Sequence, residues 1–93
     1  MEIVDNNFLR QFEVNIDGQL AKVEYALQER KIFLTKIILP ENSTDEFKEA
    51  FLIEIFEIIK DRKLRMMPTS SEIKTFLKSK REYMELLPIG VRL

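Results

Sequence analysis

The sequence predicts an α+β fold in a single domain of residues 1–93, in which helices cover a mixed β-sheet. Three observations support this prediction. Polar and apolar residues alternate on both sides of Asp17-Gly18, apolar residues recur at helical spacing from Phe47 to Ile59, and the short run Leu64–Met67 ends at a proline. We therefore expect the order βββαβαα, an antiparallel meander plus one parallel strand.

The first three strands are expected at residues 12–16, 21–27 and 32–39. In the first two, apolar residues alternate with polar ones, which is typical of half-buried strands. Asp17-Gly18 lies between them and supplies the positive φ angles of a tight hairpin turn. The third strand lacks a clean alternation, which favours a central strand covered on both faces. Pro40 ends it, because proline cannot donate to a β-ladder.

The long helix is expected to begin at Ser43, because Ser43 and Glu46 have the spacing of a capping box. Thr69 and Glu72 have the same spacing and predict the start of a second helix. Residues 82–87 predict one or two further helical turns. The connection from the third strand through the long helix to the strand at 64–67 is a βαβ crossover, which makes these two strands parallel.

Composition excludes several classes of site and protein. The chain has no cysteine and no histidine, so thiolate or imidazole metal sites, cysteine nucleophiles and Ser-His-Asp chemistry are absent. No apolar run is long enough to span a membrane, and no secretory signal is apparent, so we expect a cytoplasmic protein that binds no membrane.

Charge is segregated along the chain. Residues 41–61 carry seven acids and two bases, whereas residues 62–81 carry one acid and seven bases. The simpler interpretation is two faces that pair within the fold or lie in solvent, and the functional one is a surface that meets phosphate or nucleic acid. The net charge of −1 and the scarcity of aromatic residues among these bases argue against a nucleic-acid partner.

Several strings occur in an order that resembles the small, single-domain branch of the GNAT N-acetyltransferase superfamily. A strand contains Val23-Glu24-Tyr25, the next ends in Ile38-Leu39-Pro40, and a long helix leads to a strand that ends in Met67-Pro68. A further helix then leads to Arg81-Glu82-Tyr83. The similarity covers about Phe8 to Leu87. The resemblance implies a GNAT-like fold and acetyl transfer from acetyl-CoA to a small-molecule or protein amine.

The resemblance also implies site residues. Ser70 matches an active-site position as a polar group, and Tyr83 matches a residue that lines the acetyl pocket or donates a proton to the leaving thiolate. Glu24, which faces the other side of its strand from Tyr25, is a candidate general base acting through water. The cofactor-binding positions are Ile38, Leu39 and Pro40 for the pantetheine arm, Ser43, Thr44, Asp45 and Phe47 for the diphosphate, and Lys80. No metal is implied.

The sequence departs from the family pattern at the cofactor loop. Asp45 and Phe47 occupy the positions of two glycines that let a diphosphate approach the backbone, and the histidine and cysteine positions of the family hold Lys36, Ser70 and Lys80. A carboxylate beside a diphosphate repels it. Two hypotheses stay open: an acetyltransferase with weakened or lost activity, and a non-catalytic GNAT-like interaction or regulatory module. Asp45 and Ser70 are also simply explained as helix-capping residues.

Overall fold

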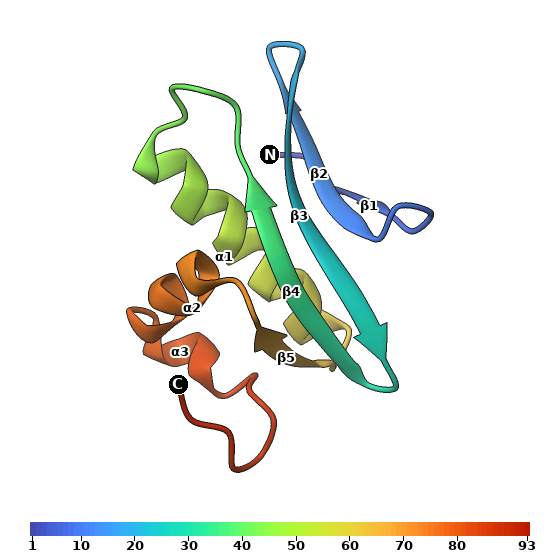
Figure 1. Ribbon diagram of the computed structural model, residues 1–93, viewed down its shortest axis with the longest axis vertical. Coiled ribbons are helices and arrows are strands. Elements are labelled where there is room, and N and C mark those ends of the chain that lie inside the picture. The colour runs from blue at the N-terminus through green and yellow to red at the C-terminus, as the bar shows by residue number, and fades with distance from the viewer.

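A computed structural model describes all residues of the chain, 1–93, as a five-stranded sheet with three helices. The strands lie in the order β1-β2-β3-β4-β5 (Figure 1). The first four are antiparallel, and β4 and β5 are parallel. The predicted mixed sheet with one parallel pair is therefore confirmed. The elements are β1 Val4–Asn6, β2 Gln11–Ile16, β3 Gln19–Gln28, β4 Lys31–Ile38, α1 Asp45–Asp61, β5 Arg65–Pro68, α2 Ser71–Lys78 and α3 Arg81–Met84.

Strand β1 was not predicted from the sequence. Its three residues are too few to show an alternation, and it forms because Asp5 pairs with Phe12 along the edge of β2. The side chain of Asp5 then accepts hydrogen bonds from the Tyr25 hydroxyl and from Arg62 at the end of α1. These bonds tie the edge strand to the body of the fold. The last helix, α3, covers residues 81–84 instead of the expected 82–87.

The predicted hairpin turn is confirmed. Asp17 and Gly18 have φ angles of 51° and 81°, and the Asn15 side chain accepts a hydrogen bond from the Gly18 N–H. The turn sets a register in which Phe12 faces Val23, and both are fully buried. A shift of one residue would turn both of these apolar side chains to the solvent.

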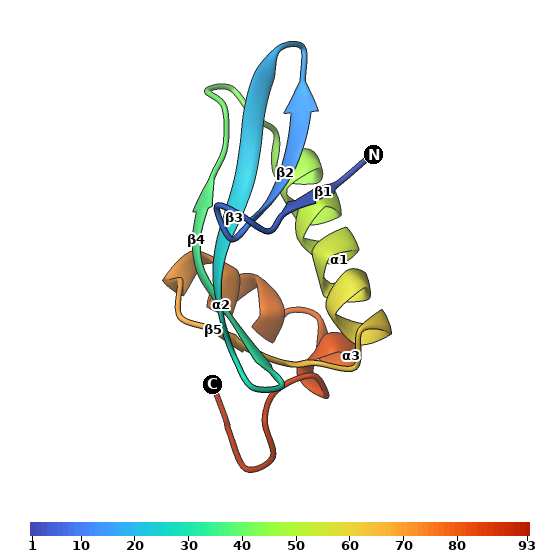
Figure 2. The same ribbon diagram turned by 90° about the vertical axis from the view of Figure 1, so that its right-hand side faces the viewer.

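Strand β4 is central in the sheet, but only one of its faces is covered. Ile32 and Leu34 are fully buried, whereas Phe33 is half-buried and Thr35 is exposed. The expectation that this strand is covered on both faces is therefore wrong. The physical reason is that the buried residues of α1 all pack into the single core on one face of the sheet, and Figure 2 shows α1 running along that face.

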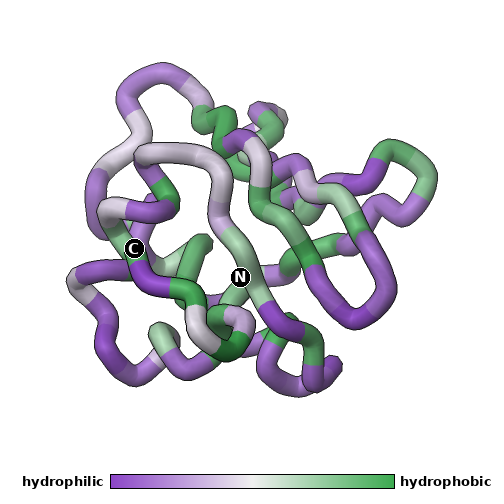
Figure 3. Tube along the Cα trace, turned by 60° about the horizontal axis from the view of Figure 1, so that its bottom comes forward, coloured by the Kyte–Doolittle hydropathy of each residue, from purple (hydrophilic) through white to green (hydrophobic).

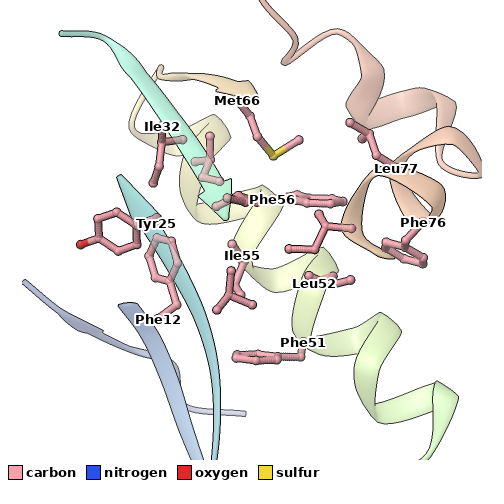
Figure 4. Close-up of a cluster of buried hydrophobic side chains, with 14 of the residues drawn as sticks. Phe12, Tyr25, Ile32, Phe51, Leu52, Ile55, Phe56, Met66, Phe76 and Leu77 are labelled. Atoms are coloured by element: carbon pink, nitrogen blue, oxygen red, sulfur yellow. The ribbon is translucent and has the colours of Figure 1, made fainter. Parts of the chain in front are cut away.

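One cluster of eighteen buried residues forms the core between the sheet, α1 and α2. Hydrophobic and hydrophilic segments alternate along the trace, and most of the turns are hydrophilic (Figure 3). Phe56 of α1 lies at the centre, with its ring centroid 6.0 Å from that of Phe76 and 5.4 Å from that of Tyr83 (Figure 4). This core fixes α1 against β4 and β5. None of the helices has both the length and the apolar character that crossing a bilayer requires.

Candidate functional site

Strands β4 and β5 separate halfway along β4. They pair from Lys31 to Leu34, and the pairing ends where Leu34 meets Pro68. Beyond this point the carbonyl oxygen of Leu34 accepts hydrogen bonds from the N–H groups of Thr69 and Ser70, at 2.9 and 3.3 Å. The chain then turns into α2, so the second half of β4 has no strand on its β5 side. An open backbone edge results.

A β-bulge in β4 determines which groups face this open edge. Tyr25 pairs with Leu34 and Glu24 pairs with Lys36, so Thr35 is an extra residue. The Tyr25 N–H points toward β2, where it donates to Arg10. Successive residues of a strand point their backbone groups to opposite sides, so the backbone of Glu24 points toward β4. Its partner Lys36 points back toward β3. The N–H and C=O groups of the next residue, Ile37, therefore face away from β3.

The expected pantetheine positions can now be placed on this edge. Ile38 pairs with Lys22 of β3, so its backbone is turned inward. By the same alternation Ile37 and Leu39 present their backbone groups to the open edge. Pro40 closes the segment, and its carbonyl accepts from the Ser43 hydroxyl at 2.6 Å. Of the three expected positions, Leu39 therefore presents its backbone to the open edge, Ile38 does not, and Ile37 is a further residue that does.

Helix α1 is capped by Thr44 and not by Ser43. The Thr44 hydroxyl accepts a hydrogen bond from the Phe47 N–H at 3.0 Å, while Ser43 folds back onto the loop. The predicted Ser43–Glu46 capping box is therefore wrong by one residue, because the Ser43 hydroxyl is already used within the loop. The N–H groups of Asp45 and Glu46 have no partner in the protein, but each belongs to a residue with a carboxylate.

A hollow of about 290 Å³ lies between the loop of residues 40–44 and the β2–β3 turn. Its lining includes Asp17 and Glu41 but no basic side chain. Phe47 contributes one wall, and its ring is stacked on that of Phe51 with centroids 5.7 Å apart. This hollow lies at the start of a helix, where an anion would be favoured, yet its charge opposes a diphosphate.

A second hollow, of about 430 Å³, separates the first half of α1 from α2. Asp45, Glu49 and Glu72 line it, and its one cation, Lys48, is paired with Glu72 at 3.0 Å. Lys80 lies near it with its ammonium 5.7 Å from the ring centroid of Phe76. The acidic surface of the first hollow therefore continues along α1.

Ser70 lies beside the start of the open edge. Its N–H bonds to Leu34, where β4 and β5 separate, and its hydroxyl accepts from the Ile73 N–H at 3.3 Å. Ser70, not Thr69, is therefore the N-cap of α2, which corrects the second predicted capping box. The hydroxyl proton of Ser70 is still free to be donated, because the cap uses only an oxygen lone pair.

Glu24 lies on the sheet face opposite to the core, next to the bulge. Its carboxylate is 3.3 Å from the Lys22 ammonium, and its side chain is 35% exposed, so water reaches it. Its backbone pairs with Lys36, which brings Glu24 close to the point where the open edge begins.

Tyr83 is not brought together with these residues. Its hydroxyl donates to Glu57 at 2.6 Å, and this hydrogen bond to a carboxylate raises the pKa of Tyr83 to about 12. Glu57 is twelve residues after Asp45 in α1, which corresponds to about 18 Å along the helix. Tyr83 therefore lies beside the second half of α1, away from the start of that helix.

Sequence reasoning missed Thr35 and Ile37, which shape the open edge. A bulge has no reliable residue signature, and here it results from how β3 and β4 pair. Tyr25 is buried beside Phe12, and desolvation, reinforced by the hydrogen bond to Asp5, raises its pKa to about 12. Its role is to join strands.

Comparison with family models gives no match, and comparison with curated proteins gives none either. Among solved structures, the fold is similar to the NMR solution structure of a "GCN5-like putative N-acetyltransferase" from Staphylococcus aureus. The TM-score is 0.74 at 17% sequence identity, and the match covers 98% of this chain and 90% of the other. This similarity, together with the separated parallel strands and the bulge, shows that the chain has a GNAT-like fold.

Proposed function

We propose that this protein is a GNAT-type N-acetyltransferase that moves an acetyl group from acetyl-CoA to an amine of a small molecule or protein, with weakened affinity for the cofactor. The observation that carries the proposal is the open edge of β4, with the Ile37 backbone free on one side and Ser70 at its start. Backbone groups of this kind suit the amide-containing pantetheine arm, which can bond to a strand edge much as another strand would.

The residues of this site suit the pantetheine arm of acetyl-CoA better than they suit its diphosphate. The backbone of Ile37 and Leu39 fits the pantetheine arm. The start of α1 offers the N–H groups of Asp45 and Glu46, but their carboxylates repel a diphosphate. The hydrophobic Phe47 ring fills space beside them. We therefore assign binding to the pantetheine side and expect a poor diphosphate site.

The residues beside the open edge have separate roles in this proposal. Acetyl-CoA supplies an acetyl thioester, and an amine needs to lose a proton as it attacks. Glu24 holds a solvent-accessible carboxylate that takes this proton through a water molecule. The Ser70 hydroxyl has a donor to spare for an oxygen or sulfur atom at the edge. Tyr83 has no role in this arrangement, because Glu57 occupies its hydroxyl.

The experiment removes one of the backbone N–H groups that the proposal uses, that of Ile37. Ile37→Pro deletes the donor at the open edge without breaking a bond to β3, because proline is tolerated where a strand N–H is not in the ladder. We expect acetyl-CoA affinity, measured by calorimetry, to fall about fivefold or more, which is the effect of one lost hydrogen bond. The matched variant Ile37→Val keeps the N–H and should bind like the original protein.

Equal affinity in both variants, at unchanged thermal unfolding, would contradict this binding mode. The reaction itself is tested with a panel of amines, and the release of free CoA thiol measures their acetylation. Glu24→Gln should lower the rate and shift the pH profile, while leaving acetyl-CoA affinity unchanged.

A second function is favoured by the carboxylates around the start of α1. Asp45, Glu49 and Glu72 face one hollow, and Asp17 and Glu41 line the other. A GNAT-like domain with such a surface would serve as a non-catalytic interaction or regulatory module. Absence of acetyl-CoA binding at millimolar cofactor, in a folded protein, would select this alternative.

A further inference from the structure

A group of unpaired cations gathers where the β3–β4 turn meets the connection from α1 to β5, at the lower right of Figure 1. We call it the basic pole and define it as Arg30, Lys31, Lys60, Lys63 and Arg65. All five side chains are exposed, and none belongs to any of the four ion pairs in the structure. The neighbouring Arg62 is excluded because Asp5 neutralises it.

The two arginines of the basic pole are held in place by the main chain. Arg30 donates to the carbonyl of Lys63 at 3.1 Å, and Arg65 donates to the carbonyl of Glu85 at 2.8 Å. The backbone N–H of Arg65 also donates to the backbone carbonyl of Arg30, at 2.9 Å. A guanidinium has five N–H donors, so these contacts orient both side chains and leave donors free for another molecule.

Two hollows adjoin each other at Arg65. The first, of about 440 Å³, is lined by Lys60, Lys63, Leu64, Arg65, Glu85 and Leu86. The second, of about 370 Å³, is lined by Gln28, Glu29, Arg30, Lys31 and Arg65. An extended chain that crosses Arg65 would pass through both hollows and meet cations in each of them.

We propose that the basic pole is a docking surface for an acidic, extended segment of a partner protein. Cations outnumber carboxylates here, since Glu29, Asp61 and Glu85 are the acids of these segments. The Glu29 and Glu85 side chains in the hollows can accept hydrogen bonds from peptide N–H groups, whereas a nucleic-acid backbone has no such donors. No aromatic side chain lines either hollow, so bases would have nothing to stack on.

This surface is independent of acetyl transfer. It lies at the C-terminal end of α1, and the cofactor loop lies at the other end, about 25 Å away along seventeen residues. Two other cations of the basic sequence block, Lys74 and Lys78, lie on α2. They provide a matched control for loss of charge.

The test uses a fluorescein-labelled peptide of ten residues in which glutamate and serine alternate. We expect saturable binding by fluorescence anisotropy at low salt, which weakens as salt is added. Replacing two exposed cations of the pole, Lys31→Gln with Lys60→Gln, should weaken binding about tenfold. The control, Lys74→Gln with Lys78→Gln, removes the same charge from α2 and should leave the affinity unchanged.

Four results would overturn the proposal. The first is that the peptide shows no saturable binding, and the second is an equal loss of peptide affinity in both double variants. The third is tighter binding of an oligothymidine of twenty nucleotides than of the peptide. The fourth is salt-sensitive self-association of the chain that the Lys31 and Lys60 substitutions abolish. The last would mean that the acidic end of a second copy occupies the pole. Thermal unfolding by circular dichroism confirms that each variant is folded.

Discussion

Replacing Asp45 by asparagine should strengthen the binding of acetyl-CoA while weakening the fold. Asp45 is the first residue of α1, beside the two backbone N–H groups that have no protein partner. A carboxylate about 5 Å from a bound phosphate costs about 0.8 kcal/mol at the dielectric constant of water and about 3 kcal/mol at an effective value of 20. Since Asp45 is exposed, we take about 1.4 kcal/mol, which corresponds to a tenfold gain in affinity for Asp45→Asn.

The same substitution should lower the free energy of unfolding by about 0.3–1 kcal/mol, because an anion at a helix N-terminus interacts favourably with the helix dipole. Asp61→Asn provides the control. It makes the same chemical change at the other end of α1, where it should leave acetyl-CoA affinity unaltered and slightly raise stability. Calorimetry with acetyl-CoA and urea unfolding measure the two quantities.

Opposite signs for affinity and stability in Asp45→Asn would support a phosphate near the start of α1. If stability falls and the affinity for acetyl-CoA stays the same, the reasoning about the diphosphate position is refuted. An equal gain in Asp61→Asn would also refute it, since the effect would then come from net charge and not from position.

Three further predictions concern stability. Thr44→Ala should cost about 1 kcal/mol in urea unfolding through loss of the N-cap bond, and Ser43→Ala should cost less; the reverse order would contradict the assigned cap. Phe56→Ala should cost about 3–5 kcal/mol by the same measurement, because Phe56 is fully buried between α1, α2 and α3; a cost below 1 kcal/mol would mean that this core is not formed. Unfolded tyrosines ionise near pH 10, whereas Tyr25 and Tyr83 ionise at about 12 in the fold, so stability should fall as pH rises from 10 to 12. Guanidinium unfolding at pH 9 and 11 checks this, and Tyr25→Phe should show a smaller fall.

The sequence by itself determined the order of elements from β2 to α2 and the parallel pairing of β4 and β5. Local signals were enough, because Asp17-Gly18 specifies its turn through positive φ angles and the α1 stripe from Phe47 to Ile59 has the helical period. Strong local periodicity leaves little for tertiary contacts to decide. The same signals failed at the helix starts, where neighbouring hydroxyl residues compete for one capping position.

Only the tertiary structure decided where the site lies and what it contains. The open edge exists because Thr35 bulges against β3 and because β5 leaves β4 after Leu34, and both depend on how distant segments pair. Strand pairing likewise turned the Ile37 backbone to this edge. Packing engaged the Tyr83 hydroxyl with Glu57 and assembled the basic pole from two turns more than thirty residues apart. Such placements depend on three-dimensional packing, so no local sequence pattern could reveal them.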